Sequence, residues 1–293
     1  MTPTAARVQA QAKVNLFLRV LAREASGYHQ LETLFARIDL ADPIEVAVDT
    51  AVREVTCRGA DVGPMERNLA FRAAEAFLGA TGWRTGFAIT IEKRIPMGGG
   101  LGGGSADAGA VLRALNALAP TPLAATDLAT LAFGLGADVP FLTVEHPLAL
   151  AWGRGERLLA LPPLPPREML LCLPPFGVET AAAFGWVAEA REGAGLTASA
   201  PLTLDRLHGW DGVAALAAND FEPPVIARHP EIATCLDALT AAGAELARMS
   251  GSGSTTFGVF PGALPPLSRG LPEGTRVVRT RLADRVAPVE RLG

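Results

Sequence analysis

The sequence predicts an α+β protein built from two mixed, layered domains, and three observations support this prediction. The chain has 293 residues, about twice the usual length of a single domain. Segments with the period-two pattern of strands alternate with segments of helical spacing. The stretch "LLALPPLPPR" (158–167) holds two Pro-Pro pairs, which neither a helix nor a central strand tolerates. We therefore place a domain boundary there, with domains over residues 1–160 and 161–293.

The first half is expected to alternate strands with two strong helices. Alternating or apolar-rich stretches predict strands at "KVNLFLRV" (13–20), "IEVAVDT" (44–50) and "FAITIEKR" (87–94). The segment "NLAFRAAEAFLGATG" has helical spacing and can end at Gly79 or Gly82. A second helix is predicted over "SADAGAVLRALNAL" (105–118), before Pro120. Its apolar stripe indicates core packing rather than a cofactor site.

The second half repeats this mixture with alanine-rich helices. Strands are predicted at "EMLLCLP" (168–174), "STTFGVF" (254–260) and "RVVRTRL" (276–282), and a helix over "PEIATCLDALTAAGA" (230–244). No internal repeat is apparent. Both halves therefore have the composition of layered α+β domains.

Composition excludes several classes of function. The formal net charge of −4 and the pI near 5.7 give no support to broad binding of nucleic acid or membrane. Cys57, Cys172 and Cys235 are far apart, without the spacing of metal ligands or of a disulfide framework. No N-terminal signal pattern is visible, and proline interrupts the most apolar stretches. We expect a soluble cytoplasmic protein that is a monomer or a homodimer.

The most informative stretch is "PMGGGLGGGSADAG" (96–109), where six glycines fall within seven residues between a strand and a helix. Glycine costs conformational entropy, so such a cluster needs a reason. Without β-carbons, the backbone can approach an anion and direct several N–H groups at it, and the following helix adds its positive end. Ser105 could cap that helix, bind a phosphate or contact magnesium. The alternative is a flexible glycine hinge.

Neither common phosphate-loop pattern fits this stretch. A P-loop requires Lys-Ser or Lys-Thr after its last glycine, and "GGGSA" has no lysine. Gly98, Gly100 and Gly103 satisfy G-x-G-x-x-G, but no strand ending in an acidic residue follows about 20 positions later. The strand–loop–helix context still favours an anion site of another type over a flexible hinge.

The stretch "PMGGGLGGGSADA" resembles the nucleotide-binding loop of the GHMP kinases. Five further motifs follow the order and spacing of one branch of that family: "AQAKVNLFLRV", "GYHQLETLF", "GADVPFL", "NDFEPPV" and "MSGSGSTTFGVF". Two departures are small. "GGGSAD" replaces the frequent "GGGSSN", and Pro265 with Pro266 should shorten a helix that relatives often carry within "PGALPPLSRGLP".

The resemblance implies a two-domain GHMP kinase fold with the active site in the cleft between the domains. The N-terminal domain would be ribosomal-protein-S5-like and the C-terminal domain ferredoxin-like. The branch phosphorylates the 2-hydroxyl of 4-diphosphocytidyl-2-C-methyl-D-erythritol with ATP, in the non-mevalonate route to isoprenoid precursors. Magnesium would arrive with the nucleotide, because no acidic cluster has metal-ligand spacing.

The resemblance also assigns residues to the nucleotide. Asn68 and Lys93 match positions near the adenine, and Ser105 is the candidate magnesium contact. The complete set of expected ATP-binding residues is Asn68, Lys93, Pro96, Met97, Gly98, Gly99, Gly100, Leu101, Gly102, Gly103, Gly104, Ser105 and Ala106.

Asp138 and Lys13 match the family's catalytic pair. From composition alone, Asp138 would be a turn or helix-cap aspartate and Lys13 a solvated lysine. The resemblance makes Asp138 the general base for the acceptor hydroxyl and Lys13 the cation that pairs with it and orients that hydroxyl. Asn15 shares the Lys13 face of its strand and is expected either to contact substrate or to make a structural hydrogen bond.

The stretch "ASGYHQLET" (25–33) places the chain's one tyrosine, Tyr28, beside His29. By resemblance this pair matches the cytidine site, and Phe184 matches the ring on the opposite face of the base. Stacking on aromatic rings suits a flat base, and an imidazole can read the hydrogen-bonding edge of cytosine. The remaining expected substrate contacts are Thr180, Gly251, Ser252 and Gly253.

Other interpretations stay open at this stage. Tyr28 and His29 could be ordinary surface residues, and the loop around Gly251 a plain hairpin. The enzyme could be a GHMP kinase for mevalonate or homoserine, although such substrates need no clamp for a nucleobase. A non-enzymatic RNA-binding module is a third hypothesis, against which the acidic pI, the glycine loop, Lys13 and Asp138 all argue.

Overall fold

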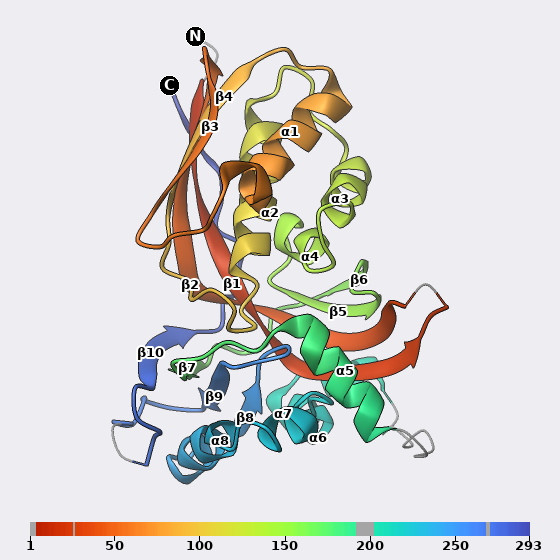
Figure 1. Cartoon of the computed structure of the whole chain (residues 1–293), viewed down its shortest axis with the longest axis vertical. Coiled ribbons are helices and arrows are strands. Elements are labelled where there is room, and N and C mark those ends of the chain that lie inside the picture. Colours follow the sequence, from red (N-terminus) through yellow and green to blue (C-terminus); the bar gives the residue numbers. More distant parts are fainter. Residues whose placement is uncertain (1–3, 26, 192–201, 268–269) are drawn as a thin grey trace.

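Two sheets organise the computed structural model of the protein, which describes residues 4–25, 27–191, 202–267 and 270–293 (Figure 1). The first sheet has the order β11-β1-β2-β4-β3, and β5 adds to β2 and β6 to β5. In the described part of the chain, β3 and β4 pair in parallel, and the other strand pairs of this sheet are antiparallel. Its strands are β1 (Ala5–Arg23), β2 (His29–Thr50), β3 (Arg53–Arg58), β4 (Gly86–Glu92), β5 (Leu148–Gly153), β6 (Arg157–Leu161) and β11 (Glu290–Leu292).

The strands β1 and β2 are much longer than the sequence predicts. The pairing of β1 with β2 shifts register between Gln11 and Lys13, between Asn15 and Phe17, and between Val20 and Ala22. Each shift interrupts the period-two pattern, so alternation is visible only in pieces of the strand. The end of β1 and the start of β2 stay in the first sheet, where β2 pairs with β5. They also reach the second half of the chain, where α5 lies beside them (Figure 1).

Four helices cover one face of the first sheet (Figure 1): α1 (Leu69–Thr81), α2 (Gly103–Leu118), α3 (Ala125–Phe133) and α4 (Val139–Thr143). The two predicted helices are confirmed as α1 and α2. Asn68 caps α1 by accepting the Ala70 N–H at 2.8 Å, and Gly82 ends it in the left-handed conformation. A β-carbon at Gly109 would lie 2.4 Å from the Leu142 carbonyl oxygen, so α2 and α4 can approach closely only with glycine there.

The second sheet has the order β10-β7-β9-β8, with helices packed against it and against the end of β1. Its strands are β7 (Glu168–Leu173), β8 (Leu246–Met249), β9 (Thr256–Phe260) and β10 (Arg276–Arg281), and the helices of this half are α5 (Thr180–Ala190), α6 (Trp210–Leu216), α7 (Glu222–Ile226) and α8 (Glu231–Ala241). The strands predicted at 168–174, 254–260 and 276–282 and the helix predicted at 230–244 correspond to β7, β9, β10 and α8.

The two halves of the chain are joined by backbone hydrogen bonds and by β11, a strand from the end of the chain that belongs to the first sheet. Leu18 N donates to Ala218 O at 2.8 Å, and Asp220 N donates to Leu18 O at 3.0 Å. The last strand, β11, returns to pair with β1, which places the two ends of the chain side by side (Figure 1). The boundary near residue 160 stays a prediction, because β11 belongs to the first sheet.

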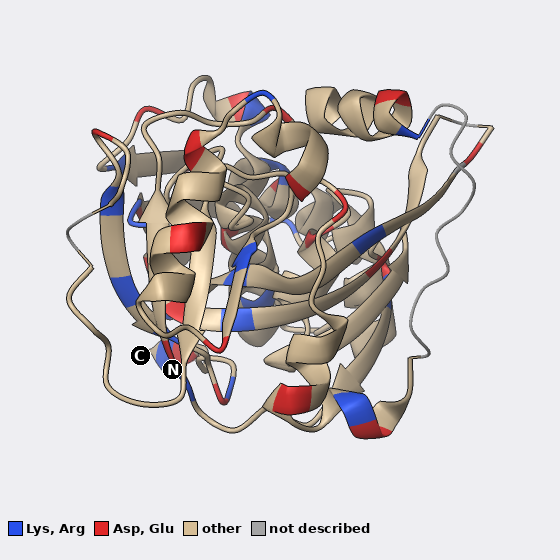
Figure 2. Ribbon diagram, turned by 90° about the horizontal axis from the view of Figure 1, so that it is seen from below, with Lys and Arg blue, Asp and Glu red and all other residues tan. Residues whose placement is uncertain are grey.

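Three further features complete the description. Residues 261–267 and 270–275 contain no helix, consistent with the effect expected of Pro265 and Pro266. Within the described ranges, every helix is too short or too polar to cross a bilayer. Figure 2 shows basic and acidic residues interspersed over the ribbon rather than gathered on one element.

Candidate active site

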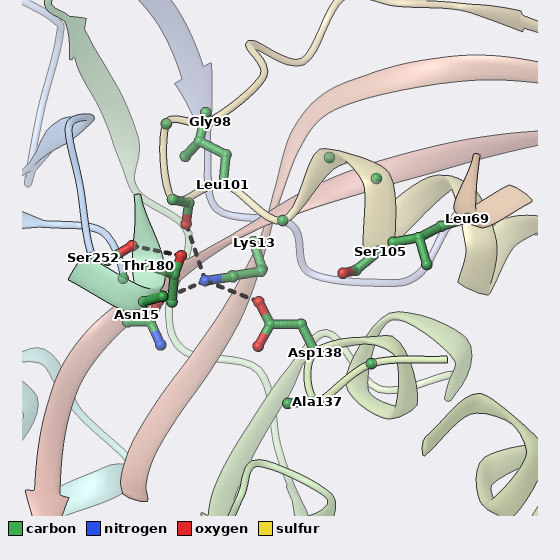
Figure 3. Close-up of a pocket in the computed structure, with 18 of the residues that line it drawn as sticks. Lys13, Asn15, Leu69, Gly98, Leu101, Ser105, Ala137, Asp138, Thr180 and Ser252 are labelled. Atoms are coloured by element: carbon green, nitrogen blue, oxygen red, sulfur yellow. Dashed lines mark hydrogen bonds and ion pairs between the residues drawn. The ribbon is translucent and has the colours of Figure 1, made fainter. Parts of the chain in front are cut away.

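A pocket of about 1260 Å³ lies where the two sheets meet, and both glycine-rich loops border it. Its walls come from β1, β2, the first turn of α2, the residues before α4, and α5 (Figure 3). Most of the sequence-predicted site residues line it. Ala106 and Gly253 do not, since Ala106 is buried within α2 and Gly253 packs behind its loop.

Lys13 is the buried centre of this site. Its side chain is only 4 % exposed, and its ammonium lies 3.4 Å from Asp138 Oδ2. The ammonium also donates to Asn15 Oδ1 at 2.7 Å and to the Gly100 carbonyl at 3.0 Å (Figure 3). A buried charge needs such a full set of partners, because desolvation would otherwise cost several kcal/mol. Lys13 therefore has one fixed position in the pocket.

Asn15 has its polar atoms engaged within the protein. Its Oδ1 accepts from Lys13, and its Nδ2 donates to Thr33 Oγ1 at 2.8 Å. Thr33 Oγ1 in turn donates to the Phe17 carbonyl at 2.6 Å. The structural hydrogen bond expected as one alternative is present, and contact of Asn15 with substrate stays a prediction.

Asp138 precedes the short helix α4 but does not cap it with its side chain. Its carboxylate is 33 % exposed and faces Lys13. Arg37 holds the other end of α4 by donating to the carbonyls of Phe141 at 2.8 Å and Val144 at 2.9 Å. A cation is favourable at the carbonyl end of a helix. Burial nevertheless lowers the pKa of Arg37 to about 9. Arg37 thus fixes the helix that presents Asp138.

The first glycine loop turns its backbone around the start of α2. Gly98, Gly100 and Gly102 all have positive φ, between 69° and 78°. The first turn of α2 contains no acidic residue, so nothing on that turn neutralises the positive helix end. Ser105 lies on this turn with its hydroxyl directed toward the Lys13 side of the pocket (Figure 3). The arrangement can hold a phosphate.

The second glycine loop, between β8 and β9, packs directly onto the first. Ser250 Oγ donates to the Gly100 carbonyl at 2.9 Å, and Thr255 N donates to the Gly99 carbonyl at 3.2 Å. A β-carbon at Gly100 would lie 2.0 Å from the Ser250 carbonyl oxygen. The loop joins two antiparallel strands as a hairpin loop, and it also borders the pocket. Its Ser252 hydroxyl lies 3.0 Å from that of Thr180 (Figure 3).

Lys93 also lines the pocket and lies in a cluster with two acids. Its ammonium is 2.5 Å from Asp42 Oδ2 and 2.7 Å from Asp107 Oδ2, and its side chain is 3 % exposed. Asp42 also accepts the Arg94 and Ile95 backbone N–H groups. Burial lowers the pKa of Lys93, but Asp107 and Asp42 outweigh that effect and raise it. Burial raises the pKa of Asp107 to about 7, against the attraction of Lys93.

The aromatic residues expected at the cytidine site also line the pocket. The His29 ring stacks on Phe184, with centroids 4.5 Å apart and planes 12° apart. Phe221 meets Phe184 edge-on at 4.9 Å. Tyr28 is 59 % exposed and carries the Arg154 guanidinium over its ring at 4.0 Å. The rings lie together, although a Tyr28–cytosine–Phe184 sandwich stays a prediction, because His29 itself contacts the face of Phe184.

Several residues of the site were not identified from the sequence. Arg37 and Asp42 carry no local signal, since their partners are distant in the chain. Thr33 and Ser250 lie within the quoted motifs "GYHQLETLF" and "MSGSGSTTFGVF", but the motifs alone do not reveal their hydrogen bonds. Asp107 lies within the quoted "GGGSAD" stretch, and its acidic character in a phosphate loop was a usable signal. Among the residues that the structure describes, no group of three or more His, Cys, Asp or Glu side chains could hold a metal ion.

Comparison with known proteins gives a consistent answer. The model of the GHMP kinases N terminal domain matches residues 68–146, and that of the GHMP kinases C terminal domain matches residues 204–273. A 4-diphosphocytidyl-2-C-methyl-D-erythritol kinase from a Geobacter species is 43 % identical, covering 86 % of this chain and 88 % of its own.

Solved structures show the same likeness. A crystal structure of 4-(cytidine 5'-diphospho)-2C-methyl-D-erythritol kinase superposes with a TM-score of 0.74 at 36 % identity, covering 94 % of this chain and 98 % of its own. Homoserine kinase from Cytophaga hutchinsonii superposes with a TM-score of 0.71 at 18 % identity, covering 99 % and 98 %. The second likeness shows a shared fold alone.

The Lys93 cluster generates a prediction about stability. Lys93→Met leaves Asp42 and Asp107 buried without their cation, and we expect it to lower the free energy of unfolding by about 3–5 kcal/mol. Urea unfolding followed by circular dichroism measures this loss. Arg53→Met removes the exposed Arg53–Glu75 pair and serves as the control, with a loss of about 1 kcal/mol or less. Equal losses in the two variants would contradict a structural role for Lys93.

Proposed function

We propose a mechanism from the premise that this chain belongs to the 4-diphosphocytidyl-2-C-methyl-D-erythritol kinases, a branch of the GHMP kinases. The family resemblance and the two-domain GHMP kinase fold expected from the motifs are thereby confirmed. The chain is an ATP-dependent kinase that phosphorylates 4-diphosphocytidyl-2-C-methyl-D-erythritol in isoprenoid precursor biosynthesis. The alternative substrates mevalonate and homoserine have less support, because the homoserine kinase likeness concerns the fold alone.

The Lys13–Asp138 pair is the observation that carries the mechanism. Asp138 Oδ2 lies 3.4 Å from the Lys13 ammonium, and the Asp138 side chain is 33 % exposed to the pocket. We assign Asp138 to accept the proton of the acceptor 2-hydroxyl as its oxygen attacks the γ-phosphorus. The bond between that phosphorus and the oxygen bridging to the β-phosphate then breaks, and ADP leaves.

Lys13 orients the reacting groups in this mechanism. Its ammonium is held by Asn15 and the Gly100 carbonyl, so it approaches Asp138 from one direction. A fixed cation next to the transferred phosphoryl group offsets charge that develops in the transition state. Because Lys13 and Asp138 act on the same proton transfer, we treat them as one unit.

The triphosphate is assigned to the first glycine loop and the start of α2. Backbone N–H groups there and the positive helix end attract phosphate oxygens. The Ser105 hydroxyl makes no hydrogen bond to a described residue and borders the pocket, so it fits a magnesium ion that the nucleotide brings. A magnesium ion held there with the nucleotide would neutralise part of the phosphate charge.

Two properties outside the reaction complete the proposal. We assign the enzyme to the cytoplasm, which the free thiols of Cys57, Cys172 and Cys235 support, because such thiols persist in a reducing compartment. We also assign it no nucleic-acid partner, which the acidic pI and interspersed charges support (Figure 2).

A substrate panel tests the proposed reaction. Coupled detection of ADP release is expected to give turnover with 4-diphosphocytidyl-2-C-methyl-D-erythritol, and little with mevalonate or homoserine. Phosphorus NMR of the product locates the new phosphate on the 2-hydroxyl. Preferential turnover of homoserine or mevalonate would contradict the proposed substrate.

Replacement of the catalytic pair tests the mechanism. Asp138→Asn removes the proton acceptor and is expected to lower kcat by at least ~10²-fold with little change in ATP binding. Lys13→Ala is expected to act similarly, and the double variant to lose far less than the product of the two effects. Asp127→Asn, at an exposed aspartate of α3, is the control. Near-normal turnover by Asp138→Asn would exclude Asp138 as the base.

The cytosine clamp has its own test. Tyr28→Ala and Phe184→Ala are each expected to raise KM for the cytidylylated substrate ~10-fold or more without changing KM for ATP. His29→Phe keeps a ring against Phe184 but removes both ring nitrogens, so preference for the cytidine substrate over its uridine analogue should fall. His208→Phe, in an exposed position, is the control. An unchanged cytidine preference in His29→Phe would assign the reading of the base elsewhere.

A further inference from the structure

Arg154 is an arginine of the pocket that the proposed mechanism does not use. It occupies the turn between β5 and β6, where its backbone N–H donates to Glu156 Oε2 at 2.7 Å. Its guanidinium lies 4.0 Å above the Tyr28 ring and 2.6 Å from Glu24 Oε2. One flat face is thus stacked while the side chain remains 33 % exposed at the pocket wall.

The turn that carries Arg154 contacts two parts of the site. A β-carbon at Gly155 would lie 3.3 Å from the Ala137 carbonyl, so the turn rests against the residue before Asp138. On its other side, Arg154 covers Tyr28 of the expected cytosine clamp. This turn therefore contacts both Tyr28, which would hold the base, and Ala137, which precedes the residue that would activate the alcohol.

In the substrate, a diphosphate joins the cytidine to the methylerythritol unit that carries the reacting hydroxyl. Binding this charged linker in a partly apolar pocket requires a cation. Among the described residues that line the pocket, the basic side chains are Lys13, Arg67, Lys93 and Arg154. The side chains of the two lysines are only 3–4 % exposed, and each ammonium already has its partners: Asp138 and Asn15 for Lys13, Asp42 and Asp107 for Lys93. Arg67 belongs to the 3-10 turn η1 (Met65–Arg67) next to α1, at the nucleotide end.

We propose that Arg154 binds the diphosphate of the cytidylylated substrate and thereby contributes to substrate specificity. This inference rests on the proposed function. Guanidinium suits the role because it can stack on Tyr28 and form paired hydrogen bonds to phosphate oxygens in its own plane. Glu24 occupies the hydrogen-bonding edge of the guanidinium in the absence of substrate, and the diphosphate replaces it there.

Binding of CDP and of cytidine separates this role from support of Tyr28. Both ligands contain the base, but CDP alone contains the diphosphate. Calorimetry is expected to show that Arg154→Gln weakens CDP ~10-fold or more and cytidine less than ~2-fold, as loss of a charge-assisted hydrogen bond predicts. Arg154→Lys keeps the charge without the planar fork, so an intermediate loss of CDP affinity is expected. Glu24→Gln removes a competing anion and should tighten CDP binding.

Arg228→Gln is the matched control. Arg228 lies 4.8 Å above the Trp186 ring and 2.7 Å from Glu189 Oε2, which reproduces the environment of Arg154 outside the pocket. Its loss is expected to leave both affinities unchanged. Equal weakening of CDP and cytidine in Arg154→Gln, or weakening of neither, would overturn the inference. If the wild-type chain binds neither ligand while Asp138 still supports turnover of another alcohol, the proposed substrate fails, and the inference fails with it.

Discussion

The buried ammonium of Lys13 is the constraint on which the rest of the site depends. It is held by a side chain of its own strand, by a carbonyl of the first glycine loop and by the carboxylate that precedes α4. Each partner comes from a different element, so all three must reach one point to compensate the cost of burying the charge. The register shifts of β1 on either side of Lys13 and Asn15 let the strand place both residues there.

Packing of the first glycine loop on the second is one reason why the first loop is rich in glycine. The Gly100 carbonyl accepts from both Lys13 and Ser250, and the backbone of Gly100 lies directly against Ser250. A side chain at position 100 would separate the loops and withdraw a partner from Lys13. The first loop therefore needs glycine for this contact as well as for access of an anion, and the second half of the chain becomes part of the site.

Burial distinguishes the structural cations of the pocket from those available to a ligand. Lys93 and Arg37 are almost completely buried, and their hydrogen bonds go to groups that the fold itself must satisfy. Arg154 has a carboxylate partner of the same kind but remains one-third exposed beside Tyr28. If a diphosphate replaces Glu24 as the partner of Arg154, no buried carboxylate loses its cation. If Lys93 turned to a ligand, Asp42 and Asp107 would both be buried without a cation. Similar ion pairs thus have different roles.

The sequence by itself determined the features that depend on neighbouring residues. The helices α1 and α2 follow from periodicity and from the residues at their ends, and the ordered motifs identified the family and with it Lys13 and Asp138. Only the tertiary structure decided the partners. Asp42 binds Lys93, which is 51 residues away in the sequence, and Glu24 binds Arg154, which is 130 residues away. His29 stacks on the face of Phe184 that was expected to hold the base. Such pairs depend on strand register and bulges, which shift whole strands relative to one another and leave no local trace in the sequence.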